Sequence, residues 1–319
     1  MASLRCPTYV DIEGLRLTSE FSPEPVREAL KFVPRAGDVM LVTYPKCGTH
    51  WVQQILQLIV SGGQSADNFY ECLARTPFLE LLGTRILEGV PEPRLIKTHL
   101  PLARLTLRDE ARYVYVARNP WDCCVSFYHH TKAMPAADFR EGTFEDFFEL
   151  FVSGQTDHGC FFDHLLPWYG IRTQPNVLFI TYEQLSKDRR GTVLKIARFL
   201  GRGYEQELLH NQGLLQTVLD KSSAEFMKRL FVLDPLVLKR ILDRDPNALP
   251  DEMKALFGKV FVASKREANT VSFVRKGIVG DSKDFFTREQ LQRMQQLIEK
   301  KTVGSDVMQL WLDEDPLQP

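Results

Sequence analysis

Residues 38–51 read DVMLVTYPKCGTHW, and this stretch decides the fold. Its first seven residues form a short, mostly apolar run that ends at a proline, which is typical of a buried strand. Apolar residues then recur at Val52, Ile55, Leu56 and Ile59, on one face of a helix. A strand, a short loop and a helix in this order indicate part of a parallel βαβ unit.

The loop between this strand and this helix carries Lys46 and Gly48. In such loops, backbone N–H groups and the helix N-terminus face an anion, the lysine adds positive charge, and the glycine lets the backbone approach. A Walker A loop needs an earlier glycine and has its lysine after the second one, so the order here argues against an ATPase or a nucleotide kinase. Taken alone, the loop also fits a plain turn with a solvated lysine.

Other segments complete an alternating pattern of strands and helices. Three more runs rich in Val, Ile, Leu, Tyr or Phe read as buried strands, at residues 94–97, 112–117 and 176–182. Helical patterns follow Thr143 and cover residues 188–200, where Gly201 supplies a C-terminal cap. Continuous apolar strands suit a parallel sheet covered on both faces. We therefore predict an α/β fold with its ligands at the carboxyl ends of the strands.

Composition excludes several classes of protein. Lys and Arg total 40 against 41 Asp and Glu, which argues against a dedicated nucleic-acid binder. The apolar stretches are too short to span a bilayer, and residues 1–12 lack the apolar core of a signal peptide. The six cysteines contain no Cys-x-x-Cys pair, which argues for reduced thiols and against a zinc site. We expect a cytoplasmic protein with no membrane or nucleic-acid partner.

Polar motifs follow the other predicted strands. They are KTHLP at residues 97–101, RNPWD at 118–122 with Ser126 beyond it, and FVRKGIVGD at 273–281. Together with the first loop, these motifs resemble the cytosolic sulfotransferase family, whose loop usually reads TYPKSGTxW; Cys47 replaces the serine. The resemblance covers about residues 35–290. It implies a single domain over residues 1–319, a parallel sheet like that of nucleotide kinases, and 3′-phosphoadenosine 5′-phosphosulfate (PAPS) as sulfuryl donor.

The resemblance also assigns residues to the donor and to its product, adenosine 3′,5′-bisphosphate (PAP). Lys46 is expected at the 5′-phosphosulfate, where the 5′-phosphate is held by the backbone of Cys47, Gly48, Thr49 and His50 and by the Thr49 side chain. Adenosine is expected to contact Trp51 and Tyr182. The 3′-phosphate is expected to bind Arg118, Ser126, Arg275, Lys276 and Gly277.

His99 and Lys97 are the catalytic residues that the resemblance implies, alongside Lys46. Histidine titrates near neutral pH, so His99 suits a general base that removes the proton of an acceptor hydroxyl. Sulfuryl transfer, like phosphoryl transfer, depends on alignment and charge stabilisation, which two lysines supply without a metal. Lys97 and His99 are two residues apart, so strand alternation points their side chains the same way.

This sequence departs from the family pattern at three places. Ala224 stands where a phenylalanine normally stacks on adenine opposite the tryptophan; either Phe226 replaces it or adenine stacks on one side only. Ser282 replaces the tryptophan of the GDWK segment. In the family's dimer motif, Arg288 and Gln292 replace valine and glutamate. A cation at a small apolar interface costs desolvation, so we predict a monomer or a dimer through another surface.

The sequence defines the acceptor less closely than the donor. By position, Phe78, Tyr128 and Phe151 resemble aromatic residues that line the acceptor pocket of family members acting on phenols. They favour a phenol, a catechol or an aromatic monoamine, while steroids and aliphatic alcohols stay open. Gln155 stands where an acidic residue gives one member its preference for amines, so the sequence predicts no such preference. A binding protein without turnover is the main alternative, and the presence of Lys46, Lys97 and His99 argues against it.

Overall fold

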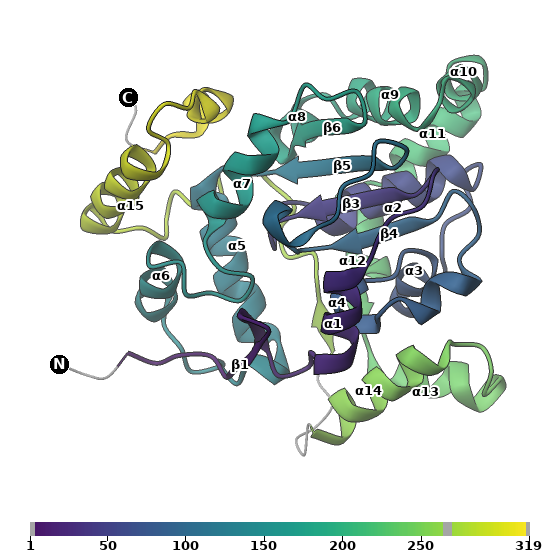
Figure 1. The fold of residues 1–319 in the computed structure, drawn as a ribbon, viewed down its shortest axis with the longest axis horizontal. Helices are drawn as coiled ribbons and strands as arrows, with labels where there is room; N and C mark the ends of the chain where they lie inside the picture. Colours follow the sequence, from purple (N-terminus) through teal and green to yellow (C-terminus); the bar gives the residue numbers. More distant parts are fainter. Residues whose placement is uncertain (1–3, 264–269, 317–319) are drawn as a thin grey trace.

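A computed structural model describes residues 4–263 and 270–316 of the chain (Figure 1). Its centre is a parallel sheet with the strand order β4-β3-β5-β6. The strands are β3 (Val39–Thr43), β4 (Leu95–Thr98), β5 (Arg112–Ala117) and β6 (Val177–Thr181). All four predicted strands are confirmed, with ends that differ by at most one residue.

Helices cover both faces of this sheet, which explains why the strands are apolar throughout. In β3, Leu41 faces the core beneath α2 (Thr49–Val60) and α9 (Arg189–Leu200). Its neighbour Val42 faces the opposite core, which α5 (Pro120–Ala133) and α7 (Phe161–Gly170) help to close. Successive residues of a strand point to opposite faces, so each must be apolar when both faces are buried.

The remaining elements surround these layers. The other helices are α1 (Pro23–Lys31), α3 (Phe69–Arg75), α4 (Leu79–Leu82), α6 (Phe144–Val152), α8 (Tyr182–Lys187), α10 (Arg202–His210), α11 (Gln212–Lys221), α12 (Ala224–Leu230), α13 (Pro235–Arg244), α14 (Asp251–Ala263) and α15 (Arg288–Lys301). Short 3-10 helices are η1 (Arg85–Gly89), η2 (Leu102–Arg104), η3 (Pro135–Ala137) and η4 (Val307–Glu314). Two small antiparallel sheets pair β1 (Tyr9–Ile12) with β2 (Leu15–Thr18) and β7 (Val232–Leu233) with β8 (Val271–Ser272).

The capping signals of the sequence are confirmed. Thr143 and Asp146 form a reciprocal capping box at the start of α6. Gly201 ends α9, and its N–H donates to the carbonyl oxygen of Ala197. Such signals fix where helices begin and end, because they satisfy backbone groups that the helix itself leaves unpaired.

The strand order creates a switch point beside β3. The chain passes from β3 to β4 on one side, then crosses back to β5 on the other side. Ligands of open α/β sheets bind where the order reverses, outside the carboxyl ends of the strands. The loops that leave β3, β4 and β5 contain Lys46, His99 and Arg118, so the predicted site residues meet at this point.

The C-terminal segment packs against the loop that follows β5. Trp311, which is fully buried in η4, donates its indole N–H to Glu183 Oε2 over 2.7 Å. Glu183 Oε1 accepts from the backbone and side-chain N–H groups of Asn119 at 3.0 and 2.8 Å. One buried carboxylate therefore joins the end of the chain to the start of α5.

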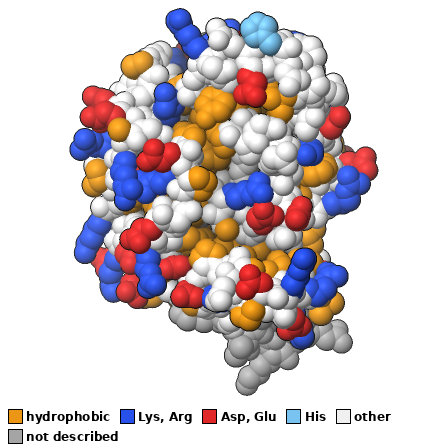
Figure 2. Space-filling model, turned by 90° about the vertical axis from the view of Figure 1, so that its right-hand side faces the viewer, with side chains coloured by type: hydrophobic (Ala, Val, Ile, Leu, Met, Phe, Trp, Pro, Cys, Tyr) orange, Lys and Arg blue, Asp and Glu red, His pale blue; other side chains and the backbone are white. Residues whose placement is uncertain are grey.

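The surface carries charges of both signs. On the face drawn in Figure 2, Lys and Arg side chains are interspersed with Asp and Glu, and apolar side chains emerge between them. Within the described part of the chain, no helix has both the length and the apolar content needed to cross a bilayer.

A buried ion pair stabilises the base of the sheet. Asp38 and Arg94, each less than 5% exposed, form two parallel hydrogen bonds of 2.7 and 2.6 Å just before β3 and β4. Asp38→Ala should lower the free energy of unfolding by about 3–5 kcal/mol in a urea titration, because it leaves a buried guanidinium unpaired. The double variant Asp38→Ala/Arg94→Met should recover much of that loss, and a single variant that costs less than about 1 kcal/mol would contradict this account.

Candidate functional site

One cavity lies at the carboxyl ends of β3, β4 and β5. At one end, which we call the cationic end, its wall is formed by Lys46, Arg118, Arg275 and Lys276. At the other, the aromatic end, the wall includes Phe21, Phe78, Asp157 and His158. Lys97 and His99 also line the cavity. The structure thus brings the three predicted catalytic residues to one continuous space.

The loop after β3 has an unusual backbone conformation. Lys46 has φ 68° and Gly48 has φ 102°, and α2 begins at Thr49. A Cβ atom on Gly48 would lie 2.9 Å from the ring of Tyr182, so only glycine fits without displacement. The positive φ of Lys46 is uncommon for a residue with a side chain and is imposed by the surroundings.

Two groups behind the loop fix this conformation. Arg118 donates to the carbonyl oxygen of Lys46 at 3.4 Å, and the Cys123 thiol lies at the same distance from the carbonyl oxygen of Pro45. The Cys47 side chain is buried against Cys123, with its sulfur 3.7 Å away, and does not line the cavity. Cys47 can therefore contribute only its backbone to the site.

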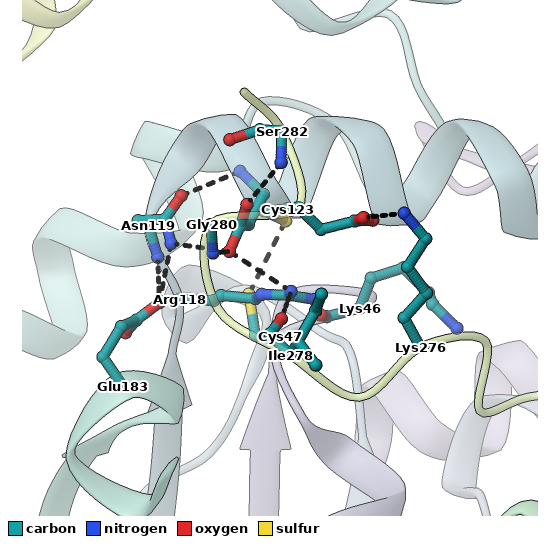
Figure 3. Close-up of polar contacts among 12 residues, drawn as sticks. Lys46, Cys47, Arg118, Asn119, Cys123, Glu183, Lys276, Ile278, Gly280 and Ser282 are labelled. Atoms are coloured by element: carbon teal, nitrogen blue, oxygen red, sulfur yellow. Dashed lines mark hydrogen bonds and ion pairs between the residues drawn. The ribbon is translucent and has the colours of Figure 1, made fainter. Parts of the chain in front are cut away.

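Asp122 organises the cationic end through its contacts with Arg118, Gly280 and Ser282, which are labelled in Figure 3. Its carboxylate accepts from Gly280 N–H at 2.8 Å and from Ser282 N–H at 3.0 Å, and it pairs with Arg118 at 3.4 Å. Burial alone would raise the pKa of Asp122, but the Arg118 charge and these hydrogen bonds outweigh it and lower the pKa. The carboxylate therefore stays ionised and ties residues 280–282 to the start of α5.

The residues expected at the 3′-phosphate all line the cavity: Arg118, Ser126, Arg275, Lys276 and Gly277. Arg118 is 7% exposed, and its Nε has no hydrogen-bond partner among residues 4–263 and 270–316. Arg275 and Lys276 both pair with Asp281. The sequence analysis missed Asp281, although its place after two cations and two glycines was a usable signal. A buried donor without a partner fits an anion that this end of the cavity would bind.

Aromatic side chains flank the β3 loop. Trp51 lies 5.1 Å from the ring of Tyr182 and donates its indole N–H to the Ser222 carbonyl oxygen at 2.8 Å. Ala224 lines the cavity, whereas Phe226 is half-buried outside its wall. The structure therefore brings Trp51, Tyr182 and Ala224 together but does not place the Phe226 ring opposite Trp51. His50 also lines the cavity.

His99 is oriented by the backbone of β3. Its Nδ1 lies 2.7 Å from the carbonyl oxygen of Thr43. A carbonyl oxygen only accepts, so Nδ1 carries the proton and Nε2 is the basic nitrogen. Nε2 has no hydrogen bond within the described part of the chain. Burial, followed by the effect of His158, holds the pKa of His99 well below its usual value, so the ring is neutral and able to accept a proton.

Glu80, in α4, supports His99 and was not predicted from the sequence. The carboxylate is fully buried and accepts from His99 N–H at 2.7 Å. Burial raises the pKa of Glu80 to about 7. A glutamate inside the apolar run FLELL was the signal that could have revealed it. Lys97, 4% exposed, places its Nζ 5.0 Å from the centre of the Phe78 ring.

Comparison with known proteins identifies the family. Residues 36–240 match the model of the sulfotransferase domain. The chain belongs to the sulfotransferase family. It is 33% identical to the guinea pig (Cavia porcellus) 3-alpha-hydroxysteroid sulfotransferase, over 92% of this chain and 93% of that protein. It is 32% identical to the amine sulfotransferase of the rabbit (Oryctolagus cuniculus), over 88% of this chain and 85% of that protein.

A solved structure agrees with this assignment. Mouse sulfotransferase SULT7A1 complexed with PAP has a TM-score of 0.69 and 27% identity, over 95% of this chain and 96% of that one. The predictions of the family, of its α/β fold and of a PAPS-dependent transferase are thus confirmed. The sulfotransferase has no group of three or more His, Cys, Asp or Glu side chains arranged to hold a metal in residues 4–263 and 270–316.

Of the three aromatic residues predicted to line the acceptor pocket, the sulfotransferase places only Phe78 in the cavity wall. Phe78 lines the cavity and packs edge-on against His99, with ring centres 4.9 Å apart. Tyr128 lies outside the cavity wall, where its hydroxyl faces the Gly142 carbonyl oxygen at 3.4 Å. Phe151 is also outside the wall, because it packs on Tyr44 and Phe161 in the core. The apolar face of α6 is thus used for packing and not for the pocket.

The two buried lysines of the cavity, Lys46 and Lys97, predict an alkaline limit to activity. Burial, followed by the Arg118 charge, lowers the pKa of Lys46 to about 8, and burial lowers that of Lys97 to about 8 as well. Raising the pH through this value removes positive charge from both lysines. We therefore expect kcat/KM for the donor to fall above about pH 8, at least tenfold per pH unit. A pH–rate profile between about pH 6 and 9.5 measures it.

Lys46→Arg provides the control for this profile. A guanidinium stays protonated over the whole range, so the variant should show a shallower alkaline fall whatever its absolute activity. A wild-type kcat/KM that is constant or still rising at about pH 9.5 would contradict the assignment of these lysines.

Proposed function

We propose that this sulfotransferase moves a sulfuryl group from PAPS to the hydroxyl or amine of a small aromatic acceptor: a phenol, a catechol or an aromatic monoamine. The observation that carries this proposal is the single cavity that joins four cationic side chains to an aromatic end, with His99 also in its wall. The names of the relatives include both a steroid and an amine enzyme, so they do not decide the acceptor.

The donor fits the cationic end of the cavity. PAPS supplies an activated sulfuryl group on its 5′-phosphate. Lys46 and the N–H groups at the start of α2 would hold that phosphate, since Lys46 and Thr49, the first residue of that helix, both line the cavity. Arg118, with its unpartnered Nε, would bind the 3′-phosphate together with Ser126, Arg275, Lys276 and Gly277. Trp51 and Tyr182 would pack on adenosine.

His99 would act as general base. With its proton on Nδ1, its Nε2 takes the proton of the acceptor hydroxyl, and the acceptor oxygen then bonds to sulfur. The bond from sulfur to the 5′-phosphate oxygen breaks, and its electron pair stays on that oxygen. Lys46 stabilises the negative charge that develops there, and Lys97 stabilises the transferring group.

Affinity for nucleotides tests the donor assignment. PAP should bind at least about a hundredfold more tightly than AMP in calorimetry, because each charge-assisted contact to the 3′-phosphate is worth about 1.5–3 kcal/mol. Arg275→Met should weaken PAP and leave AMP unchanged, while the exposed Lys283→Met serves as control. Equal affinities for the two nucleotides would overturn the assignment of these residues.

Turnover tests the assignment of the base. His99→Ala should lower kcat about 10²–10⁴-fold and leave PAP affinity within about twofold, because the base acts on the acceptor and not on the donor. His210→Ala, which changes an exposed histidine, is the matched control. The assay should supply PAPS and ATP in parallel, since turnover with ATP alone would make the protein a kinase. Near-normal turnover of the His99 variant would mean that another group takes the proton.

Other points remain predictions. With Phe226 outside the cavity wall, we propose that adenine stacks on Trp51 alone. Arg288 and Gln292 are exposed on α15, and we retain the prediction of a monomer or of a dimer through another surface. We also retain a cytoplasmic location, turnover without a metal, and one domain over residues 1–319.

A further inference from the structure

Three ionisable side chains at the aromatic end have no role in the proposed sulfuryl transfer. Glu20 lies between β2 and α1, while Asp157 and His158 lie in the turn between α6 and α7. All three line the same cavity as Lys46 and His99. Asp157 is 8% exposed and His158 is 6% exposed, so both are more than nine-tenths buried.

Each of these side chains has a buried polar atom without a hydrogen bond. The atoms are Glu20 Oε2, Asp157 Oδ1 and His158 Nδ1, within residues 4–263 and 270–316. Neither carboxylate forms an ion pair in that part of the chain. The nearby Arg16 instead donates to Gln155 and lies 5.5 Å from the centre of the Tyr9 ring. Buried polar atoms are nearly always paired, so these three indicate a ligand with matching groups.

Hydrogen bonds hold the turn that carries Asp157 next to the end of β3. The Tyr44 hydroxyl, just after β3, lies 2.7 Å from the Thr156 hydroxyl and donates to the Gly159 carbonyl oxygen at 3.0 Å. His158 N–H donates to the Arg16 carbonyl oxygen at 3.0 Å. The position of Asp157 is therefore set by the same strand that carries the phosphate-binding loop.

Aromatic rings connect this turn to His99. The His158 ring lies 5.3 Å from that of His99, 5.7 Å from Phe21 and 6.5 Å from Phe78, measured between ring centres. Phe21 directly follows Glu20 in the sequence. The two carboxylates thus belong to the same small apolar compartment as the general base.

Electrostatics make this arrangement unfavourable without a cation. Burial, followed by the charge of Glu20, raises the pKa of Asp157 to about 7. Burial also raises the pKa of Glu20. A positive group placed between them would stabilise both ionised forms, whereas a neutral apolar group would leave them desolvated and unpaired.

We propose that the acceptor carries a protonated amine in addition to its reacting hydroxyl, and that Glu20 and Asp157 bind this ammonium group. The acceptor ring packs against the pair formed by Phe21 and Phe78, whose rings meet edge to face, and its hydroxyl reaches His99. This inference rests on the proposed function and narrows its acceptor class. Gln155, at the position that sets amine preference in another family member, has no part in it, because its side chain is directed to Arg16.

Three phenols that differ only at the end of a short side chain test the inference. They are tyramine, which carries an ammonium group, 4-ethylphenol, which is apolar there, and 4-(2-hydroxyethyl)phenol, which is polar but neutral. We expect tyramine to bind the enzyme–PAP complex at least about tenfold more tightly than either neutral phenol in calorimetry. Its kcat/KM with PAPS should exceed theirs by a similar factor.

Isosteric variants locate the recognition. Glu20→Gln and Asp157→Asn should each lower tyramine affinity about tenfold or more and leave 4-ethylphenol within about twofold. Glu141→Gln, which changes an exposed glutamate, should alter neither. The neutral phenol also reports whether each variant is correctly folded, since its turnover requires the whole site.

The outcomes separate this inference from the proposed function. Equal affinity for tyramine and 4-(2-hydroxyethyl)phenol, or variants that weaken all three phenols equally, would overturn ammonium recognition while turnover of 4-ethylphenol upheld the sulfotransferase chemistry. Conversely, a tyramine preference lost in the two variants would uphold the recognition even if no phenol were turned over, and only the proposed function would fall.

Discussion

The site depends on one buried carboxylate, that of Asp122. It joins the start of α5 to residues 280–282, far away in the sequence, and it pairs with Arg118. Without it, the segment that carries Arg275 and Lys276 would lose the hydrogen bonds of Gly280 and Ser282 and would be held by contacts such as that of Arg118 with the Ile278 carbonyl oxygen. The contacts of Asp122 offset the cost of burying its charged carboxylate, and the pKa of Asp122 is lowered as a result.

Much of this arrangement could be predicted from the sequence, because it is encoded locally. Each strand is a short apolar run, and the loops at the strand ends contain their own lysine, histidine or arginine, so the site residues could be placed before their contacts were known. The place of Glu20 and Asp157 in the cavity could not be predicted, since it arises from chain segments that meet only in the fold, whereas Glu80 and Asp281 carried local signals that were missed. Position alone also gave no way to see that Tyr128 and Phe151 pack in the core.

The cavity keeps its two ends electrically different with few charged residues. At the cationic end, burial and neighbouring cations lower the pKa of Lys46, and an anion bound there would raise it again. At the aromatic end, burial raises the pKa of Asp157, and a cation bound there would lower it again. His99 shares the cavity with both and is kept neutral by burial.

The contact between Trp311 and Glu183 has a consequence for the order in which the molecule matures. Glu183, in α8, also binds Asn119 just before α5, so this carboxylate has both its oxygens paired only when Trp311 is in place. Trp311 comes well after β6 in the sequence, so a chain synthesised from its N-terminus can assemble the central sheet before this contact forms. The start of α5 therefore gains its full set of hydrogen bonds later than the strands do.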